Sequence, residues 1–288
     1  MKFLALLSFF ISSLFGVEFS ISTVITSNAK TVYVEFDKEK NVKYKKIVAG
    51  KRAYSIFTHP KDRKKMYALL PISYYEKPKE KDFQIVYSQD SHTKSQNFSV
   101  RIEEATYLKE SITVQKSKVN PKSKAVKTRT AKEYKEAMDI YGKATRKSYI
   151  DSKFIMPMNS KITSNFGKAR VYNGSLKGYH SGTDFRAKVG TPVISTNDGV
   201  VVLAKDRFYA GGTVIINHGH GIYSCYYHLS KFKVKKGDVV HKSQIIALSG
   251  DTGRVTGPHL HFSIRVGGLQ VDPLQFIELI NTYIFKEN

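Results

Sequence analysis

Four short stretches in the C-terminal half of the chain carry side chains that can bind a metal ion or move a proton. They are "GYHSGTDF", "NHGHG", "YYHLS" and "GPHLHF", and seven of the nine histidines of the 288-residue chain lie after residue 179. A catalytic zinc ion takes three histidine or carboxylate ligands and keeps a fourth position open for water. His180, Asp184 and one histidine of "GPHLHF" would supply such a set.

A single short motif of this kind is weak evidence. With nine histidines in the chain, chance gives roughly 0.3 His-x-His pairs, and the sequence has two. The glycines around His218 and His220 in "NHGHG" predict a hairpin turn, so this pair is expected to be the accidental one. His218 is expected either to line a cleft or to lie within the turn.

The pair in "GPHLHF" has a different setting. If "HLHFSI" is a strand, His259 and His261 project from one face while Leu260 and Phe262 turn toward the core. Two imidazoles side by side on a strand with an apolar back face are an arrangement suited to a site.

The same alternation applies to "CYYHLS". It predicts that Tyr226 and His228 share one face of a strand, while Cys225, Tyr227 and Leu229 share the other. Cys225 is therefore not expected to act as a ligand or nucleophile beside His228.

The elements that must position these residues are mainly strands. From Phe154 onward, short β-type runs alternate with glycine-rich turns. Between Phe19 and Ile102, seven similar runs separated by polar turns predict a small antiparallel β-sandwich. His59 and His92 lie in polar stretches of this first region and are expected on its surface. The predicted fold class is mainly β (α+β).

A basic segment separates the two regions. From Lys116 to Arg129 six residues are basic and none is acidic, which predicts a solvated linker or, as an alternative, a polyanion-binding segment. Thr130 and Glu133 fit a capping box that would open a helix there, and Gly142 would weaken the middle of that helix.

The start of the chain indicates export. A lysine, an apolar run from Phe3 to Phe15 and Gly16 predict a secretory signal peptide, with a buried first strand or an uncleaved anchor as alternatives. An exported chain whose single cysteine is Cys225 has no internal disulfide. The net charge of +23 predicts an anionic partner, and export favours a cell-wall polymer or lipid surface over nucleic acid.

The motifs together resemble a known family. "HSGTD", "YYHL" and "GPHLHF" in this order, with "TPVISTNDGVVV" after the first and "DTGRVTGPHLHF" at the last, are similar to the lysostaphin-type, or LytM-like, zinc peptidases that cut peptidoglycan cross-links. The resemblance runs from about Ile155 through "VDP" at residues 271–273. It implies a lysostaphin-like antiparallel sheet that floors a narrow groove.

The resemblance also implies roles for five residues. His180, Asp184 and His261 would bind one zinc ion, and His228 and His259 would be the catalytic histidines. Zinc lowers the pKa of a bound water to about 7 and polarises a carbonyl. No glutamate stands within these motifs to act as a base, so the two catalytic histidines are expected to share proton transfer and oxyanion stabilisation. Which of them is the base stays open.

The sequence departs from the family pattern in two places. Members often have an arginine two residues after "FG", whereas Arg170 follows by three, and Ser243 and Gln244 stand where a Gly-Gln pair is common. Some members have lost metal ligands and activate other wall hydrolases. A catalytically silent activator or wall-binding module is therefore the alternative to an endopeptidase, although all five site positions are present here.

Resemblance to periplasmic relatives of Gram-negative bacteria implies cleavage of D-Ala to meso-diaminopimelate cross-links, with D,D-carboxypeptidase activity as a second reaction. Peptidoglycan is then the expected partner, with other cell-wall hydrolases as further candidates. We expect a signal peptide over residues 1–17, a β-rich domain over 18–107, a basic linker and helix over 108–152, and the zinc peptidase domain over 153–288.

In some relatives the preceding region covers the groove and supplies a fourth ligand. If it does so here, with Asn165 or an acidic residue of the first domain as that ligand, a chain starting near Ser152 would be the more active form.

Overall fold

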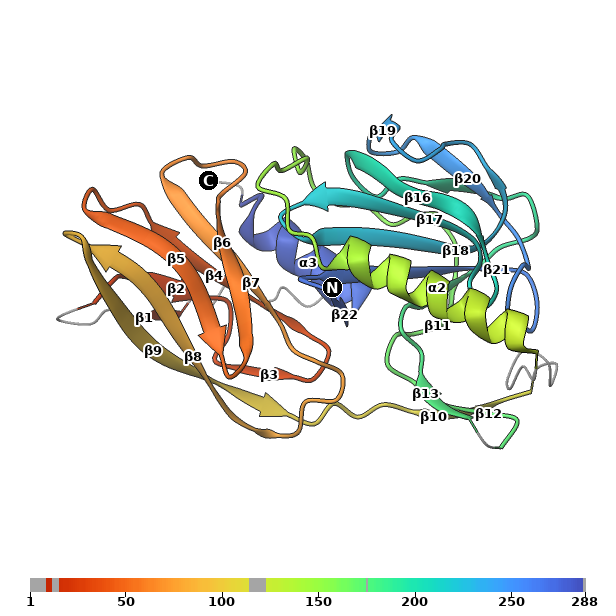
Figure 1. Ribbon diagram of the computed structural model, residues 1–288, viewed down its shortest axis with the longest axis horizontal. Coiled ribbons are helices and arrows are strands. Elements are labelled where there is room, and N and C mark those ends of the chain that lie inside the picture. The colour runs from red at the N-terminus through yellow and green to blue at the C-terminus, as the bar shows by residue number, and fades with distance from the viewer. Residues whose placement is uncertain (1–8, 12–15, 114–122, 175, 287–288) are drawn as a thin grey trace. The chain divides into compact units, whose positions relative to one another are not determined.

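The computed structural model describes residues 9–11, 16–113, 123–174 and 176–286, and most of the ordered elements are strands (Figure 1). The chain divides into two compact units, which are Met1–Ala105 together with Leu279–Asn288, and Thr106–Glu278. The second unit thus takes in residues 108–152, which the sequence assigns to the linker and helix, as well as Thr106 and Tyr107 from the end of the predicted first domain. The mainly β fold class is confirmed.

The first unit is a set of short strands around one core. Nine strands follow the order β1-β2-β4-β7-β6-β5-β8-β9-β3, and all neighbours are antiparallel except β3 and β9. All seven predicted runs contain strands, and the first run divides into β2 and β3. The strands are β1 (Phe9–Ile11), β2 (Phe19–Ile21), β3 (Ile25–Ser27), β4 (Thr31–Asp37), β5 (Val42–Ala49), β6 (Arg52–Thr58), β7 (Lys65–Pro71), β8 (Lys79–Gln89) and β9 (His92–Glu103).

The apolar core of the first unit is formed by alternating side chains of strands from both halves of this strand order. Phe19 of β2 packs against Phe98 of β9 with ring centroids 5.1 Å apart, and Phe83 of β8 stacks on Phe98 at 5.3 Å. Strands of both halves therefore share a single apolar core, as expected of a small sandwich.

The two histidines of the first unit differ in their environment. His92 is exposed, as predicted, although it is the first residue of β9. His59 is 6% exposed, so its predicted surface position is wrong. Its Nδ1 accepts hydrogen bonds from the backbone N–H groups of Lys61 and Asp62, so the ring closes the turn after β6 instead of facing water.

The second unit is built on a ten-stranded sheet. Its main path is β11-β14-β21-β18-β17-β16-β19, with β15, β20 and β22 joined to it at the side. A separate three-stranded sheet has the order β10-β12-β13. The strands are β10 (Lys109–Ile112), β11 (Ile162–Ser164), β12 (Ala169–Tyr172), β13 (Leu176–Tyr179), β14 (Thr183–Arg186), β15 (Pro192–Ile194), β16 (Gly199–Arg207), β17 (Gly211–Gly219), β18 (Ile222–Phe232), β19 (Val239–Val240), β20 (Ile245–Ser249), β21 (His259–Val266) and β22 (Leu269–Val271).

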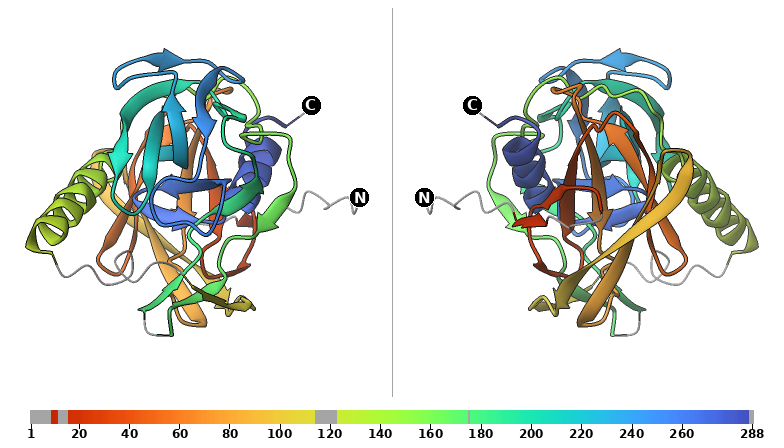
Figure 2. Two further views of the ribbon diagram at one scale, coloured as in Figure 1. Left: turned by 90° about the vertical axis from the view of Figure 1, so that its right-hand side faces the viewer. Right: turned by 90° about the vertical axis from the view of Figure 1, so that its left-hand side faces the viewer.

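One face of this sheet is covered by helix α2 (Lys124–Tyr141), which runs along β16 to β18 (Figure 2). Ala137 and Tyr141 pack into the same apolar cluster as Ile215 of β17 and Cys225 of β18. The helix is therefore part of the core of the second unit. A chain starting near Ser152 would lack it and would expose that cluster.

The predicted start of this helix is wrong. The helix begins at Lys124, with Ser123 at the N-cap, and Thr130 lies inside it with its hydroxyl donating to the carbonyl of Lys127. Arg129, which lies in the helix just before the predicted cap at Thr130, forms an ion pair with Asp206 of β16 at 2.9 Å. The part of the helix that the local pattern missed therefore makes a tertiary contact. Gly142 caps the C-terminal end instead of dividing the helix. Residues 114–122 of the predicted linker lie outside the described part of the chain.

Helix α3 (Pro273–Tyr283) is the last described element. The predicted signal peptide lies mostly outside the described residues, and Phe9–Ile11 of that segment pair with β2. Among the helices that the structure describes, none combines the length and the apolar character needed to cross a bilayer.

Candidate metal centre

Two neighbouring strands bring three of the predicted site residues together. Strands β14 and β21 pair antiparallel, and their register places Asp184 directly opposite His261. His180 lies just before β14, so it approaches the same point from the end of that strand. Gly182 makes this approach possible, because a Cβ at its position would lie 2.3 Å from the carbonyl oxygen of Phe262 and 2.7 Å from Nε2 of His261.

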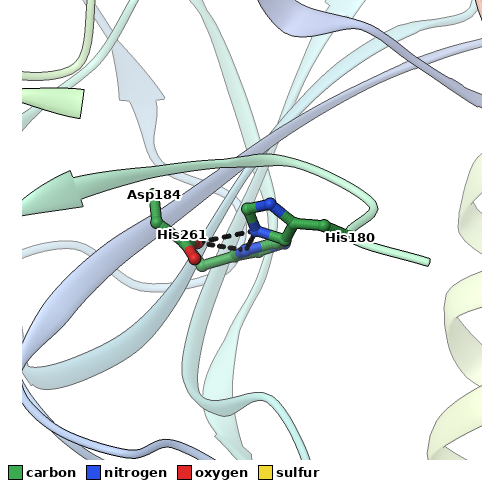
Figure 3. Close-up of side chains that lie close together, drawn as sticks. All are labelled: His180, Asp184 and His261. Atoms are coloured by element: carbon green, nitrogen blue, oxygen red, sulfur yellow. Dashed lines mark hydrogen bonds and ion pairs between the residues drawn. The ribbon is translucent and has the colours of Figure 1, made fainter. Parts of the chain in front are cut away.

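The three side chains point toward one another and are buried (Figure 3). His180 Nε2 lies 2.8 Å from Asp184 Oδ1, His261 Nδ1 lies 2.7 Å from the same oxygen, and the two nitrogens are 3.0 Å apart. In the described part of the chain, this trio is the group of three potential ligand side chains that lie closely enough to hold one metal ion.

The outer nitrogens of these two histidines fix where their protons lie. His180 Nδ1 is 2.7 Å from the carbonyl oxygen of Asn165, so it must be the N–H donor and Nε2 carries the lone pair of the neutral ring. His261 Nε2 is 3.2 Å from the hydroxyl of Ser263, which gives its own proton to the carbonyl of Ser181. His261 Nε2 is therefore also a donor, and Nδ1 carries the lone pair.

Two lone pairs and a carboxylate oxygen thus face one another within 3.0 Å. Such a set of acceptors is repulsive without a cation, and two imidazoles with one carboxylate are a ligand set that zinc prefers. Burial lowers the pKa of His261 to about 4, against the opposing effect of Asp184, so the ring is neutral near pH 7. The residues therefore fit a divalent metal ion.

Asp184 is held from its other side by Arg170. Arg170 donates from Nη2 to Asp184 Oδ2 at 3.3 Å and from Nε to Glu110 Oε2 at 3.0 Å. Arg170 thereby acquires the structural role that its shifted position after "FG" had left in doubt.

His228 reaches the same centre from an irregular point in β18. Tyr227 and His228 lie opposite the single residue Thr213 of β17, which makes a β-bulge, and His228 has a φ of 62°. Both side chains line the cavity, whereas Tyr226 is fully buried and packs on Phe262. The prediction that Tyr226 shares a face with His228 is wrong because the bulge interrupts the alternation.

The second catalytic candidate, His259, lies beside His228, and their ring centroids are 4.9 Å apart. His228 Nδ1 donates to the carbonyl of Thr252 at 2.8 Å, and His259 Nδ1 donates to that of Gly257 at 2.8 Å. Each ring is left with Nε2 as its unprotonated nitrogen when neutral. Burial, helped by His261 and His259, lowers the pKa of His228 to about 3.

A cavity of about 240 Å³ opens beside these residues. Asp184 and His261 of the metal trio line it together with His228 and His259, and tyrosines form much of the remaining wall. The site can therefore place a ligand against a bound metal ion and two further imidazoles at the same time.

The remaining histidine pair lies away from this centre. His220 and its glycine neighbours form the turn between β17 and β18, so the predicted hairpin is confirmed. His218 is in β17 and is completely buried, bonded to the carbonyl of Asp198 and the hydroxyl of Ser224, so it neither lines a cleft nor lies in the turn. Cys225 is buried against Tyr141, and burial raises the pKa of its thiol.

Sequence reasoning missed several residues that shape this site. Asn165, which is predicted as a possible metal ligand, instead accepts a hydrogen bond from His180 Nδ1 through its backbone carbonyl. Glu110 lies 70 residues before His180 and is placed by the pairing of β10 with β12, which no local pattern indicates. Thr252 and Arg254 lie in the motif "DTGRVTGPHLHF", which carries the resemblance to the family. The motif therefore indicates that the two residues matter, but it does not indicate what they do.

Residues 178–273 match the sequence profile of peptidase family M23. The chain contains a peptidase family M23 domain. The predicted resemblance to lysostaphin-type peptidases is thereby confirmed. The M23 domain carries all five predicted site residues, in agreement with the geometry of the metal trio.

Relatives of the M23 domain include named cell-wall enzymes. The chain is 42% identical over 143 residues to Peptidoglycan DD-endopeptidase ShyA of Vibrio cholerae, which covers 49% of this chain and 32% of the relative. It is 40% identical over 95 residues to DD-carboxypeptidase/endopeptidase Mpg of Neisseria meningitidis, which covers 33% of this chain and 22% of the relative. The matches thus span less than a third of the length of these relatives.

A crystal structure from Pseudomonas aeruginosa, described as a peptidase M23, resembles the whole architecture. It superposes with a TM-score of 0.65 at 24% identity and covers 85% of this chain and 92% of that chain. This likeness shows that the two chains share a fold.

Proposed function

We propose that this protein is an exported zinc endopeptidase that hydrolyses the peptide cross-links of peptidoglycan. The bond between D-Ala and meso-diaminopimelate is the proposed substrate, and D,D-carboxypeptidase activity is the proposed second reaction. The observation that carries the proposal is the convergence of two imidazole lone pairs and a carboxylate beside two further imidazoles. The names of the relatives support the choice of peptidoglycan.

In this proposal His180 Nε2, Asp184 Oδ1 and His261 Nδ1 hold the zinc ion. Zinc held by three protein ligands lowers the pKa of a water in its open position to about 7 and polarises the scissile carbonyl. The protein contributes the orientation of the ligands, because each outer histidine nitrogen is fixed by a hydrogen bond to a backbone carbonyl or to Ser263.

His228 and His259 take the roles of proton carrier and oxyanion donor. Their Nδ1–H groups are held by the carbonyls of Thr252 and Gly257, which leaves both Nε2 atoms for the cavity. A neutral Nε2 accepts a proton, and a protonated Nε2 donates one to a developing oxyanion or to the leaving amine. The two rings therefore supply what the absent glutamate supplies in other zinc peptidases.

The proposed location is the periplasm, reached through the predicted signal peptide at residues 1–17. The net charge of +23 fits association with an anionic wall polymer. Other cell-wall hydrolases are proposed partners at the wall.

Digestion of defined substrates by the purified, zinc-loaded protein tests the function. Cross-linked muropeptide dimers and pentapeptide monomers are incubated with the protein, and the products are weighed by mass spectrometry. We expect dimers to be split into monomers, and His261→Ala to abolish cleavage because the metal loses one of its three ligands.

A matched control comes from the same domain. His241 is 77% exposed in its side chain, so His241→Ala should cleave as the unaltered protein does. Intact dimers after incubation with protein shown to contain zinc would exclude the proposed activity.

A further inference from the structure

Arg254 occupies an unusual position in the cavity of the metal centre. It lies in the loop between β20 and β21, and its backbone N–H is anchored to the carbonyl of Tyr209 at 2.8 Å. Its guanidinium lies over the ring of Tyr172 at 4.4 Å and over that of Tyr209 at 4.9 Å. Two aromatic contacts hold the planar group in place without using its N–H donors.

Two arginines line this cavity, and their donors are used differently. Arg170 gives its N–H groups to Asp184 and Glu110, so its charge is matched by two carboxylates. Arg254 forms no ion pair or side-chain hydrogen bond with any residue in the described part of the chain. It is thus the cation in the cavity wall whose five donors are available to a ligand.

We infer that Arg254 binds the free carboxylate of the leaving half of the substrate, an inference that rests on the proposed function. Diaminopimelate carries an amine and a carboxylate on each of its two α-carbons. When one amine forms the cross-link to D-Ala, the carboxylate on that same carbon stays free and ionised. It lies one carbon from the scissile nitrogen, and planar guanidinium donors match a carboxylate in two-point geometry.

This contact gives both proposed reactions the same recognition rule. In the carboxypeptidase reaction the leaving group is a terminal D-Ala, whose α-carboxylate is also one carbon from the scissile nitrogen. In each reaction water supplies a hydroxyl group to the acyl carbon and a proton to the nitrogen as the C–N bond breaks, while the carboxylate is unchanged. Arg254 therefore selects amide bonds whose nitrogen comes from an amino acid that has a free carboxylate on the same carbon.

The discriminating experiment compares two dimers that differ in one group. In the first, the carboxylate beside the cross-linked amine of diaminopimelate is free, and in the second it is a carboxamide. For the unaltered zinc-loaded protein we expect kcat/KM on the free acid to exceed that on the amide by about 10- to 100-fold, because the half-buried guanidinium of Arg254 loses its charged partner on the amide.

Variants assign this preference to Arg254. Arg254→Gln should lose about 10- to 100-fold on the free acid and little on the amide, and Arg254→Lys should fall between because it keeps the charge but not the planar fork. Arg146 is exposed in the same unit, so Arg146→Gln removes an equal charge and should keep the full preference.

Equal rates of the unaltered protein on the two dimers would overturn the inference while leaving the proposed function standing. An equal loss on both substrates in Arg254→Gln would also overturn it, because that result indicates a purely structural role. Failure to cleave either dimer would overturn the proposed function and the inference together. The comparison in the unaltered protein can overturn the inference even if no variant folds.

Discussion

Asp184 is the residue on which the contacts of the metal centre converge. Its Oδ1 faces His180 and His261, while its Oδ2 accepts from Arg170. Arg170 is itself held by Glu110, so the orientation of the carboxylate depends on a hydrogen-bonded pair outside the ligand set. Partners of this kind orient metal ligands and commonly affect metal affinity.

We predict that Arg170→Gln weakens zinc binding by about 10- to 100-fold, because the Asp184 carboxylate is then free to rotate. A purely electrostatic role predicts the opposite, since removal of a nearby cation would strengthen zinc binding. Competition with a chelator of known zinc affinity measures the change. Lys161→Gln, an exposed charge removal in the same unit, should leave the affinity unaltered.

At the scale of elements, the bulge in β18 decides which side chains reach the cavity. It turns both Tyr227 and His228 toward the site, and it requires the left-handed backbone at His228 with φ of 62°. The backbone N–H of His228 donates to the carbonyl of Ala210 at 2.9 Å, and its ring is held by Thr252. A non-glycine residue in this region is strained.

The strain predicts that glycine, which usually destabilises a strand relative to alanine, is the more stable of the two residues at position 228. His228→Gly should be more stable to denaturant than His228→Ala by about 1 kcal/mol, because glycine adopts a positive φ without a steric penalty. At Lys231, an exposed residue of the same strand, glycine should instead be the less stable of the two. Urea unfolding of the four variants measures both differences, and an alanine variant that is the more stable at 228 would contradict the argument.

Local sequence patterns predicted the side-chain orientations of regular strands but not those that depend on how strands pair. The alternation in "HLHFSI" correctly placed Leu260 and Phe262 in the core, because β21 is regular. The same rule was wrong for "CYYHLS", because a bulge depends on how two strands pair and not on either strand alone.

The helix and Arg170 illustrate the same limit. The capping box at Thr130 is a valid local signal, but the helix extends upstream of it, where Arg129 pairs with a strand 77 residues away in the chain. The contact between Arg170 and Asp184 likewise depends on β12, and β12 is paired with a strand from before the helix. Sequence reasoning named the histidines and the aspartate that the structure brings together, and it missed the residues that orient them.

At the scale of the whole molecule, the buried ring of His218 makes a contribution to stability that depends on pH. His218 is completely buried and is bonded through both ring nitrogens. Burial lowers its pKa from 6.5 to about 4, so the folded protein keeps the ring neutral at a pH where the unfolded chain protonates it. Its contribution is fully present above pH 6.5 and is lost as the pH falls toward 4.

Between pH 7.5 and pH 5, this group should lower the free energy of unfolding by about 2 kcal/mol. We predict that His218→Gln removes this part of the pH dependence, since glutamine does not titrate. Chemical denaturation at the two pH values measures it, and His241→Gln, at an exposed position, should keep the dependence of the unaltered protein. An identical pH response in His218→Gln would show that the ring does not control acid stability.

The metal trio has a consequence for the topology of the chain. Asp184 and His261 are neighbours across two strands, yet they lie 77 positions apart in sequence. An ion bound by these residues closes a long loop, and closing a long loop lowers the conformational entropy of the unfolded chain. A protein whose single cysteine rules out an internal disulfide would thereby gain a reversible cross-link, and scarcity of metal would reduce the amount of folded protein.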